Sequence, residues 1–325
     1  MPYHYQLRPN KSPTYTNLAQ YLKQQHWKPT RFTWRAQFSE KNFQFPSAIA
    51  EQLEFKHLLA QLVEQSCPEV MPLTYNINDH NWPMVLSQIA MLQQNISWIL
   101  KPALLNNGQH IKIFHNINQI EQHFLSNKRM GGEQVLQQYL SHPYLLKGPK
   151  LGHKFSIRMF VVLTNYAGAY LFPEGYFNIA LHPYAENEFS DLRSHITNEH
   201  LSDEALNVVQ IPTAQYEFFK DFYPQIKLIV TKVLKPIPQD PVTYSSDPKL
   251  AIFGFDFLID ADSRVWLLEA NHAPCFPISD DHPLQKSVYL HFWQAFISSF
   301  VEPIAKKNAC ECTKNQLFDQ VKNID

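Results

Sequence analysis

The stretch 253–274, FGFDFLIDADSRVWLLEANHAP, constrains the fold most strongly, because two apolar runs rich in strand-forming residues flank a short polar break. The break at 261–264 predicts an antiparallel hairpin whose turn is centred between Asp262 and Ser263. A hairpin determines which residues face each other across two strands and which side chains share a face of the sheet. This prediction therefore assigns each strand residue of the stretch to one of two faces.

The predicted hairpin places two carboxylates directly opposite each other. Asp256 pairs with Glu269, Leu258 pairs with Leu267, and the period of two adds Asn271 to the acidic face. The residues expected to point to the other face are Phe255, Phe257, Trp266 and Leu268. One face of the hairpin is thus expected to be core, and the other brings two acids and an amide together.

Two facing carboxylates repel each other. At about 5 Å and an effective dielectric constant near 20, the repulsion is roughly 3 kcal/mol. A divalent cation removes it, and Mg²⁺ characteristically binds one or two protein carboxylates while phosphate and water complete its octahedron. The alternative is an acidic hairpin face that water solvates, because exposed carboxylates are common.

Length and charge exclude several classes of protein. A chain of 325 residues can bury a substantial core and predicts two or three lobes rather than one small domain. Its 28 basic and 29 acidic residues leave a net charge of −1, so no global field favours nucleic acid or an anionic membrane. The first residues, MPYHYQLRPN, lack the apolar core of a signal peptide, and no apolar run is long enough to span a bilayer. We therefore expect a soluble cytoplasmic protein with no nucleic-acid or membrane partner.

Cysteine and glycine usage excludes further chemistries. The four cysteines lack framework spacing, which is typical of a reducing compartment. Neither the pair Cys310 and Cys312 nor the group His272, Cys275 and His282 supplies a four-ligand zinc pattern. The eight glycines form no dinucleotide-binding, P-loop or nucleophile-elbow motif.

Hydrophobic periodicity predicts alternating helices and strands along the chain. Strands are expected at 3–7, 97–101, 110–114, 134–140, 154–163 and 170–180, and helices at 15–25, 52–64, 84–91, 117–126, 216–234 and 284–301. The polar, charged residues 305–325 are expected to form a mobile tail. Aromatic and basic residues interleave at 27–35, which fits a partner surface or a half-buried strand, and we favour the strand.

Basic residues on two of these strands suit an anionic ligand. Lys101 ends the strand at 97–101, and the loop at 106–109, whose Asn-Gly pair predicts a hairpin, has backbone N–H groups that could cover a phosphate. On the strand at 154–163, Lys154, Ser156 and Arg158 share one face. Two cations on one strand face fit a phosphate or a carboxylate, and an exposed strand face explains the same pattern equally well.

The order of these parts resembles the ATP-grasp architecture. More closely, the chain resembles the tubulin-tyrosine ligase-like family in the motifs WILKP, VLQQYLSHPYLL, HKFSIRMFVVL, EGYFNIALHPY, HITN, FGFDFLID and VWLLEANHAP. The resemblance spans roughly residues 98–274, and the first 75 residues fit the family's N-terminal lobe more loosely. Several motifs in one order are a far more specific signal than any one of them.

The resemblance implies an α/β (α+β) protein with an ATP-grasp fold. The implied parts are an N-terminal α/β lobe at 1–75, a small central lid lobe at 76–145, a C-terminal antiparallel-sheet catalytic lobe at 146–305 and a polar tail at 306–325.

The resemblance also implies site residues. Those implied to hold ATP, by phosphate contacts from the lysines and adenine contacts that are partly through the backbone, are Lys101, Gln137, Gln138, Tyr139, Leu140 and Lys154. The implied Mg²⁺ ligands are Asp256, Glu269 and Asn271. The implied catalytic residues are Arg158, Glu269, His195 and Asn198, with Arg158 stabilising charge on the acyl phosphate or the incoming amino acid.

The family's reaction phosphorylates a protein or peptide carboxylate and then lets an amino acid's amine displace the phosphate, so negative charge accumulates at the transferred phosphoryl group. We therefore expect an ATP- and Mg²⁺-dependent ligase that adds a free amino acid to a protein carboxylate, tubulin being the family's precedent. Two positions depart from the family's pattern, since Ser156 replaces an aspartate and Asn178 an arginine that helps to read a carboxylate. Arg158 is then the best remaining candidate for that task. The alternatives are an ATP-grasp ligase for a small peptide or metabolite, and a nucleotide-binding pseudoenzyme that recruits a partner through its N-terminal lobe.

Overall fold

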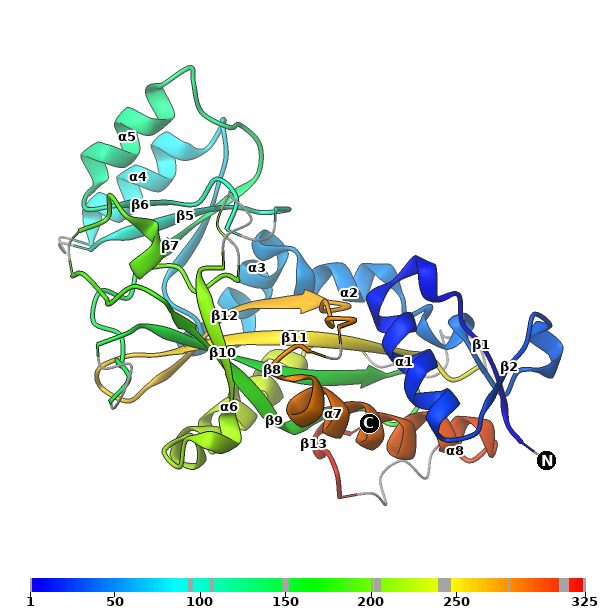
Figure 1. The fold of residues 1–325 in the computed structure, drawn as a ribbon. Coiled ribbons are helices and arrows are strands. Elements are labelled where there is room, and N and C mark those ends of the chain that lie inside the picture. Colours follow the sequence, from blue (N-terminus) through cyan, green and yellow to red (C-terminus); the bar gives the residue numbers. More distant parts are fainter. Residues whose placement is uncertain are drawn as a thin grey trace.

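The protein has a mixed α/β fold, as the sequence predicts (Figure 1). The computed structural model describes residues 2–92, 96–105, 108–147, 152–186, 188–199, 201, 206–238, 247–279, 281–309 and 316–323. The strands are β1 (His4–Gln6), β2 (Lys28–Pro29), β3 (Phe38–Ser39), β4 (Thr74–Ile77), β5 (Trp98–Pro102), β6 (Lys112–Phe114), β7 (Gln134–Gln138), β8 (Phe155–Thr164), β9 (Ala169–Ala180), β10 (Val208–Pro212), β11 (Leu250–Ile259), β12 (Val265–His272) and β13 (Asp319–Lys322).

Helices connect and cover these strands. The helices are α1 (Pro13–Gln24), α2 (Ser47–Glu54), α3 (Lys56–Ser66), α4 (Trp82–Met91), α5 (Ile117–Leu125), α6 (Phe219–Leu234), α7 (Leu290–Phe296) and α8 (Glu302–Ala305). The π-helical turns η7 (Gln285–Tyr289) and η8 (Ile297–Val301) flank α7, and short 3₁₀ turns are η1 (Pro9–Lys11), η2 (Thr33–Arg35), η3 (Glu40–Phe43), η4 (Pro68–Val70), η5 (Leu192–Ser194) and η6 (Thr213–Gln215). Within the described part of the chain, no helix combines the length and apolar character needed to cross a bilayer.

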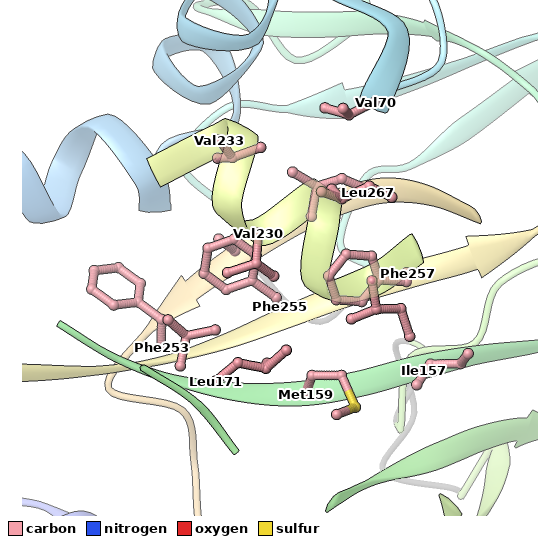
Figure 2. Packing of buried hydrophobic residues seen from close by; sticks show 14 of the residues in the cluster. Val70, Ile157, Met159, Leu171, Val230, Val233, Phe253, Phe255, Phe257 and Leu267 are labelled. Carbon is pink, nitrogen blue, oxygen red and sulfur yellow. The ribbon is translucent and has the colours of Figure 1, made fainter. Parts of the chain in front are cut away.

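The largest sheet has six strands, in the order β10-β9-β8-β11-β12, and β13 also pairs with β9. Neighbouring strands in it are antiparallel. Alternate side chains of β8, among them Phe155 and Ile157, point into a core built with α6, α3 and the hairpin (Figure 2). In Figure 2, Val230 and Val233 of α6 lie beside Phe255 of β11.

The second face of this sheet is divided into two parts. Toward the C-terminal half of β8, Phe160 and Val162 pack with Phe292 of α7 and Leu18 of α1 in a second apolar cluster. The N-terminal half of β8 turns polar side chains to the same face, because the period of a strand is two. Helices therefore cover one end of this face, and the polar end is left for a ligand site.

A smaller antiparallel sheet, β4-β7-β5-β6, carries α4 and α5 (Figure 1). Asn116 caps α5 by accepting a hydrogen bond from the backbone N of Gln119 at 3.1 Å, which satisfies one of the helix's unpaired donors. The predicted hairpin after Lys101 is confirmed by the antiparallel pairing of β5 with β6. Asn106 and Asn107 lie outside the described residues. At the N-terminus, β2-β1-β3 form a three-stranded parallel sheet.

The predicted register of the acidic hairpin is correct at the acids and wrong beyond them. Asp256 lies opposite Glu269, but a β-bulge after Asp256 shifts the pairing, so Leu258 faces Trp266 instead of Leu267. Leu267 is buried in the core, whereas Leu268 lines a cavity on the acidic face. The extra residue of the bulge, Leu268, exchanges the faces of the β12 residues between it and the turn. Trp266 likewise lies outside the core clusters, and its indole N–H donates to Asp260.

Three further predictions are wrong in detail. The helix expected at 52–64 is two helices that meet at Phe55, whose backbone is extended. The tail expected to be mobile contains β13, which pairs with Ala169–Ala180. The stretch at 27–35 is not a half-buried strand beyond β2, because Trp34 is 82% exposed on a 3₁₀ turn.

Candidate active site

A cavity of about 410 Å³ lies where the six-stranded and four-stranded sheets face each other. Its walls come from β5 and β7 of the smaller sheet, from β8 to β12 of the larger sheet, and from the loop after β9. All twelve residues singled out from the sequence line it, namely Lys101, Gln137, Gln138, Tyr139, Leu140, Lys154, Arg158, His195, Asn198, Asp256, Glu269 and Asn271. The fold thus brings together residues that are up to 170 positions apart, from Lys101 to Asn271.

At one end of the cavity the two acids are held by a cation and an amide. Arg158 lies opposite Asp256 on β8 and donates to it twice, from Nε to Oδ1 at 2.5 Å and from Nη2 to Oδ2 at 2.6 Å. Asn271 donates from Nδ2 to Asp256 at 3.2 Å and to Glu269 at 3.3 Å. Such a two-pronged contact holds both side chains in one geometry.

The two acids differ in their ionisation. Burial raises the pKa of Asp256 to about 6, against the opposing effect of Arg158. Burial alone would also raise the pKa of Glu269, but the charges of Lys56, Lys101 and Arg158 outweigh it and lower that pKa to about 2. Glu269 is therefore fully ionised at neutral pH. The charged form of Asp256 is less favourable than that of an exposed aspartate, because burial removes its hydration.

Gly254 makes room for this arrangement. A Cβ atom at position 254 would stand 2.8 Å from Cδ and 2.9 Å from Nη1 of Arg158. These distances are shorter than normal contacts, so any side chain here would push the guanidinium away from Asp256. Glycine on β11 is thus part of what positions Arg158.

Two charged residues of this end were not predicted from the sequence. Lys56, at the start of α3, places Nζ 3.5 Å from Oε2 of Glu269 and donates to the carbonyl of Leu105 at 2.8 Å. Glu54, at the end of α2, also lines the cavity, and burial raises its pKa. The break between α2 and α3 turns both side chains inward, and a sequence pattern that predicts one continuous helix cannot reveal it.

Two further lysines, Lys101 and Lys154, line the cavity. Lys101 is buried on β5 and donates to Oε1 of Gln137 on β7 at 2.8 Å. Burial lowers the pKa of Lys101 to about 8, although the charge of Glu269 raises it. Burial and the charge of Lys101 lower the pKa of Lys154 to about 7. Two buried ammonium groups with lowered pKa values indicate an anion-binding site, because a bound anion would stabilise their charged forms.

Tyr139 holds Lys154 in place and is itself oriented by His195. Its Nζ donates to the hydroxyl of Tyr139 at 3.0 Å and lies 4.4 Å from the centroid of the same ring. Nδ1 of His195 lies 2.8 Å from that hydroxyl, and Nε2 of His195 lies 2.8 Å from the carbonyl of Glu188. A carbonyl only accepts, so Nε2 carries the proton and Nδ1 accepts from Tyr139. Both nitrogens of His195 are therefore in use, and this residue acts on Lys154 through Tyr139.

The strand end at Gln138 offers fewer free backbone groups than the sequence suggests. The amide of Gln138 donates to the carbonyl of Leu73 at 2.7 Å, and the amide of Tyr139 donates to the carbonyl of Ser97 at 2.8 Å. Both amides are thus used within the protein. A ligand at this edge would have to meet other groups of the segment, among them those of Leu140.

A row of uncharged polar side chains crosses the far side of the cavity floor. Ser156 of β8, Asn178 of β9 and Gln210 of β10 lie side by side on neighbouring strands. Gln210 donates to Oδ1 of Asn178 at 2.9 Å, and Thr197 donates to the hydroxyl of Ser156 at 2.8 Å. We call Ser156, Asn178, Gln210 and Thr197 the neutral row. Asn198 lines the cavity next to it, and a Cβ at Gly108 would lie 3.5 Å from its Oδ1.

The acidic end fits Mg²⁺ better than it fits a transition metal. Among the residues that the structure describes, no group of three or more His, Cys, Asp or Glu side chains is placed to hold a metal. Asp256 and Glu269 nevertheless bring carboxylate oxygens together from two paired strands, and Asn271 joins both of them through its amide. Two carboxylates with an amide form an incomplete oxygen set, which suits an ion that keeps water and phosphate as its other ligands.

The fold and the cavity define a mixed α/β protein with a charged cleft between two antiparallel sheets. The sequence profile described as "Tubulin-tyrosine ligase family" matches residues 20–309, and the chain belongs to this family. The resemblance read from the motifs is thereby confirmed.

Individual relatives are more distant. The chain is 26% identical over 252 residues to a mouse protein described as "Probable tubulin polyglutamylase TTLL2". The aligned region covers 69% of this chain and 44% of the relative. It is 27% identical over 207 residues to "Tubulin glycylase 3D" of Tetrahymena thermophila, covering 57% of this chain and 19% of the relative. It is 25% identical over 217 residues to "Probable tubulin polyglutamylase ttll-9" of Caenorhabditis elegans, and the aligned region covers 60% of this chain and 50% of the relative. The chain thus spans half or less of the length of these relatives.

Proposed function

We propose that the protein is an ATP- and Mg²⁺-dependent carboxylate–amine ligase that joins an amino acid to a protein carboxylate through an acyl phosphate. The observation that carries this proposal is the single cavity that all twelve predicted residues line. Unrelated polar residues would not be expected to gather in one cleft, and a cleft with convergent charged groups is the usual place for a reaction.

The proposed arrangement is that of an ATP-grasp protein. In it, the four-stranded sheet with α4 and α5 is the lid lobe, and the six-stranded sheet is the catalytic lobe. Lys101 and Lys154 bind the ATP phosphates, and the segment from Gln137 to Leu140 borders the adenine. The buried ammonium groups support this role, because phosphate oxygens would repay the cost that burial imposes on their charge.

Asp256, Glu269 and Asn271 are the proposed ligands of Mg²⁺. When bound, the ion neutralises charge that develops on the transferred phosphoryl group. Arg158 holds Asp256 by two hydrogen bonds, so that carboxylate keeps its direction toward the ligand site. Lys56 holds Glu269 by an ion pair. These contacts orient the acids before any ligand arrives, which is the main contribution that a protein makes to phosphoryl transfer.

The reaction then has two balanced steps. In the first, an oxygen of the acceptor carboxylate takes the γ-phosphoryl group of ATP, and ADP leaves. In the second, the donor amine attacks the acyl carbon, the C–N bond forms, the C–O bond to phosphate breaks, and the amine loses one proton. Arg158 and Lys154 lie on the floor of the cavity where this charge accumulates, and their positive charge lowers its energy.

The acceptor is proposed by analogy. The relatives' descriptions speak of tubulin polyglutamylases and a tubulin glycylase. We propose a protein C-terminus or side-chain carboxylate, of tubulin or a protein with similar acidic segments, as the acceptor. An ATP-grasp ligase for a small peptide shares every feature of the site and differs only in the acceptor.

A nucleotide-binding pseudoenzyme is the second candidate function. The neutral row favours it, because Ser156 and Asn178 stand where the family carries an aspartate and an arginine. Such a protein would bind ATP and form no amide.

A labelling experiment tests the proposal. The purified protein is incubated with ATP, Mg²⁺, a mixture of labelled amino acids and a cell lysate, and protein-bound label and ADP are measured. We expect ADP release that requires both lysate and amino acids, together with label that survives denaturation. Glu269→Gln is the matched control and should abolish both signals. ATP binding without label or ADP in the wild type would favour the pseudoenzyme.

A further inference from the structure

The charges of the chain are unevenly distributed. Residues 1–39 contain six of its 28 lysines and arginines and none of its 29 aspartates and glutamates. The first carboxylate, Glu40, is buried, and Arg8 donates from Nε to both of its oxygens, at 2.8 and 2.9 Å. Nζ of Lys11 lies 3.8 Å from the same carboxylate. The other four cations of this stretch have no acid within it to neutralise them.

Three of these four cations lie on β2 and on the loop that joins it to β3. Lys28, Arg31 and Arg35 are all exposed, and within the described part of the chain none of them forms an ion pair or a side-chain hydrogen bond. His4 pairs with Lys28 between β1 and β2. Burial, and then the charges of Arg35 and Lys28, lower the pKa of His4. The cations therefore make this part of the surface positive, although the whole chain has a net charge of −1.

Two exposed aromatic rings lie among these cations. Phe32 is 58% exposed and Trp34 is 82% exposed, and their ring centroids are 5.8 Å apart. A single exposed apolar side chain is common on protein surfaces, whereas adjacent rings beside arginines are typical of the energetic centre of an interface. We call Lys28, Arg31, Phe32, Trp34 and Arg35 the basic aromatic surface.

The loop that carries this surface is fastened to β1 at both ends. At its start, the backbone N of Lys28 donates to the carbonyl of Tyr3 at 2.9 Å. At its end, the backbone N of Gln37 donates to the carbonyl of His4 at 2.9 Å, and the side chain of Gln37 accepts from the backbone N of His4 at 2.7 Å. The 3₁₀ turn η2 lies between these two attachments. A partner therefore meets a loop that is already ordered, which reduces the entropy cost of binding.

The basic aromatic surface is separate from the cavity. None of residues 1–39 is among the described residues that line the cavity. Figure 1 shows β2 at the end of the molecule opposite α4 and α5. A partner bound at this surface would therefore leave the groups assigned to ATP and Mg²⁺ free.

The number and kind of side chains favour an acidic protein segment over other polyanions. Basic clusters that bind anionic membranes typically have about four to eight lysines and arginines, and proteins that bind DNA commonly contact about six to ten phosphates. Three cations match a short segment with about three carboxylates instead. Trp and Arg are also among the residues most enriched where proteins bind each other.

We propose that the basic aromatic surface docks an acidic segment of a partner protein. Carboxylates of the segment meet Lys28, Arg31 and Arg35, and its apolar side chains cover Phe32 and Trp34. The inference goes beyond the proposed ligase function, because docking here requires neither a nucleotide nor the cavity. Five side chains form a small interface, so the contact is weak by itself, and salt weakens it further by screening its exposed charges.

The test uses two peptides that differ only in charge. A fluorescein-labelled peptide of four Glu-Glu-Tyr repeats and its counterpart of four Gln-Gln-Tyr repeats are titrated with the full chain, without ATP or Mg²⁺, and followed by fluorescence anisotropy. At low salt we expect the glutamate peptide to bind at least tenfold more tightly than the glutamine peptide, and the difference should shrink as salt is added. The double variant Arg31→Glu, Arg35→Glu should bind the glutamate peptide at least tenfold more weakly, and Trp34→Ala at least fivefold more weakly.

Matched variants control for net charge and for exposed apolar surface. The double variant Lys128→Glu, Lys235→Glu reverses two exposed cations elsewhere, and Met91→Ala shortens a side chain that is 79% exposed. Both should keep the affinity of the wild type. Lys154→Met removes a cation from the cavity and should also keep it. Weaker binding in Lys154→Met, with none in the variant of Arg31 and Arg35, would place the peptide in the cavity and overturn the inference.

Two further results would contradict the inference. The first is equal binding of the two peptides by the wild type, or unchanged binding after reversal of Arg31 and Arg35. The second is tighter binding of phosphatidylserine vesicles or single-stranded RNA than of the glutamate peptide, lost on the same reversal, which would replace the protein partner by another polyanion. Neither result affects the ligase proposal, because ATP binding in the cavity is measured separately and without any peptide.

Discussion

Arg158 and Asp256 lie opposite each other on neighbouring strands and are joined by two hydrogen bonds of 2.5 and 2.6 Å. Both side chains are largely buried, with 16% and 9% of their surfaces exposed. Asp256 also lies opposite Glu269 on its other side, so the arginine compensates the repulsion between two facing carboxylates. The pair is therefore a fixed structural unit as well as part of the proposed site.

Replacing the arginine by lysine tests this unit. Arg158→Lys keeps the charge but loses the fork, so we expect the free energy of unfolding to fall by about 1.5 to 3 kcal/mol, the usual worth of charge-assisted hydrogen bonds. The measurement is chemical denaturation, with the cycle completed by Asp256→Asn and the double variant. Lys306→Gln at the exposed pair with Glu302 is the control, and we expect a change within about 0.5 kcal/mol. Additive effects of Arg158→Lys and Asp256→Asn would show that the two residues are not coupled.

Gly254→Ala tests the space beside the guanidinium. The added Cβ would lie 2.8 Å from Cδ of Arg158, and we expect a loss of about 1 to 3 kcal/mol in stability, typical of overpacking. In an Arg158→Ala background the obstructing atoms are gone, so the same substitution should become neutral or slightly stabilising. An equal loss in both backgrounds would mean that something other than Arg158 excludes the methyl group.

Tyr139→Phe tests the positioning of Lys154. The variant keeps the ring that contacts the ammonium but removes the hydroxyl that accepts from it and donates to His195. We expect ATP to bind about tenfold more weakly, since one hydrogen bond to a charged group is worth about 1.4 kcal/mol or more. Tyr223→Phe removes a half-buried hydroxyl that donates to Asp319, outside the cavity lining, and should leave ATP binding unchanged. The same weakening in both variants would refute a specific role for Tyr139.

The pH dependence of ATP binding tests the state of Lys154. Its pKa of about 7 is lower than the ordinary 10.5, so most of the free protein lacks this proton at pH 8. Phosphate favours the charged form and raises the pKa, so at pH 8 Lys154 should take up about one proton on binding, in addition to the smaller uptake by Lys101, whose pKa is about 8, and affinity should fall as pH rises above 7. Calorimetry in two buffers of different ionisation enthalpy measures the uptake. Lys154→Met should reduce it by about one proton, and an unchanged uptake would show that Lys154 does not meet the phosphates.

Local patterns were enough to predict much of the site. Alternation at 154–163 placed Lys154 and Arg158 on one face, and the symmetry of the hairpin placed Asp256 opposite Glu269. These predictions depend only on the period of a strand and on one turn. They hold because both strands are long and one face is fully buried, which specifies the register strongly.

Other features depend on contacts between distant parts of the chain. The bulge opposite Asp256 moves Leu267 into the core, and β12, which carries the extra residue, contains no turn residue or glycine that would indicate it. Lys56 reaches Glu269 across 213 positions, as their numbering shows, and in the sequence it is an ordinary lysine in an amphipathic pattern. Gln210 joins the site only because β10 pairs with β9. Tertiary packing decides these placements, so a reading of local periods cannot supply them.

The most direct test of the proposed function is a calorimetric titration of ATP into the purified protein, with Mg²⁺ and with a chelator in its place. We predict saturable binding that weakens without Mg²⁺, and loss of this Mg²⁺ dependence in Glu269→Gln. Binding should also raise the free energy of unfolding, by about 2.7 kcal/mol at a hundredfold excess of ATP over Kd. No binding heat and no thermal shift with ATP and Mg²⁺, in protein shown to be folded by circular dichroism, would contradict the assignment of this cavity to a nucleotide.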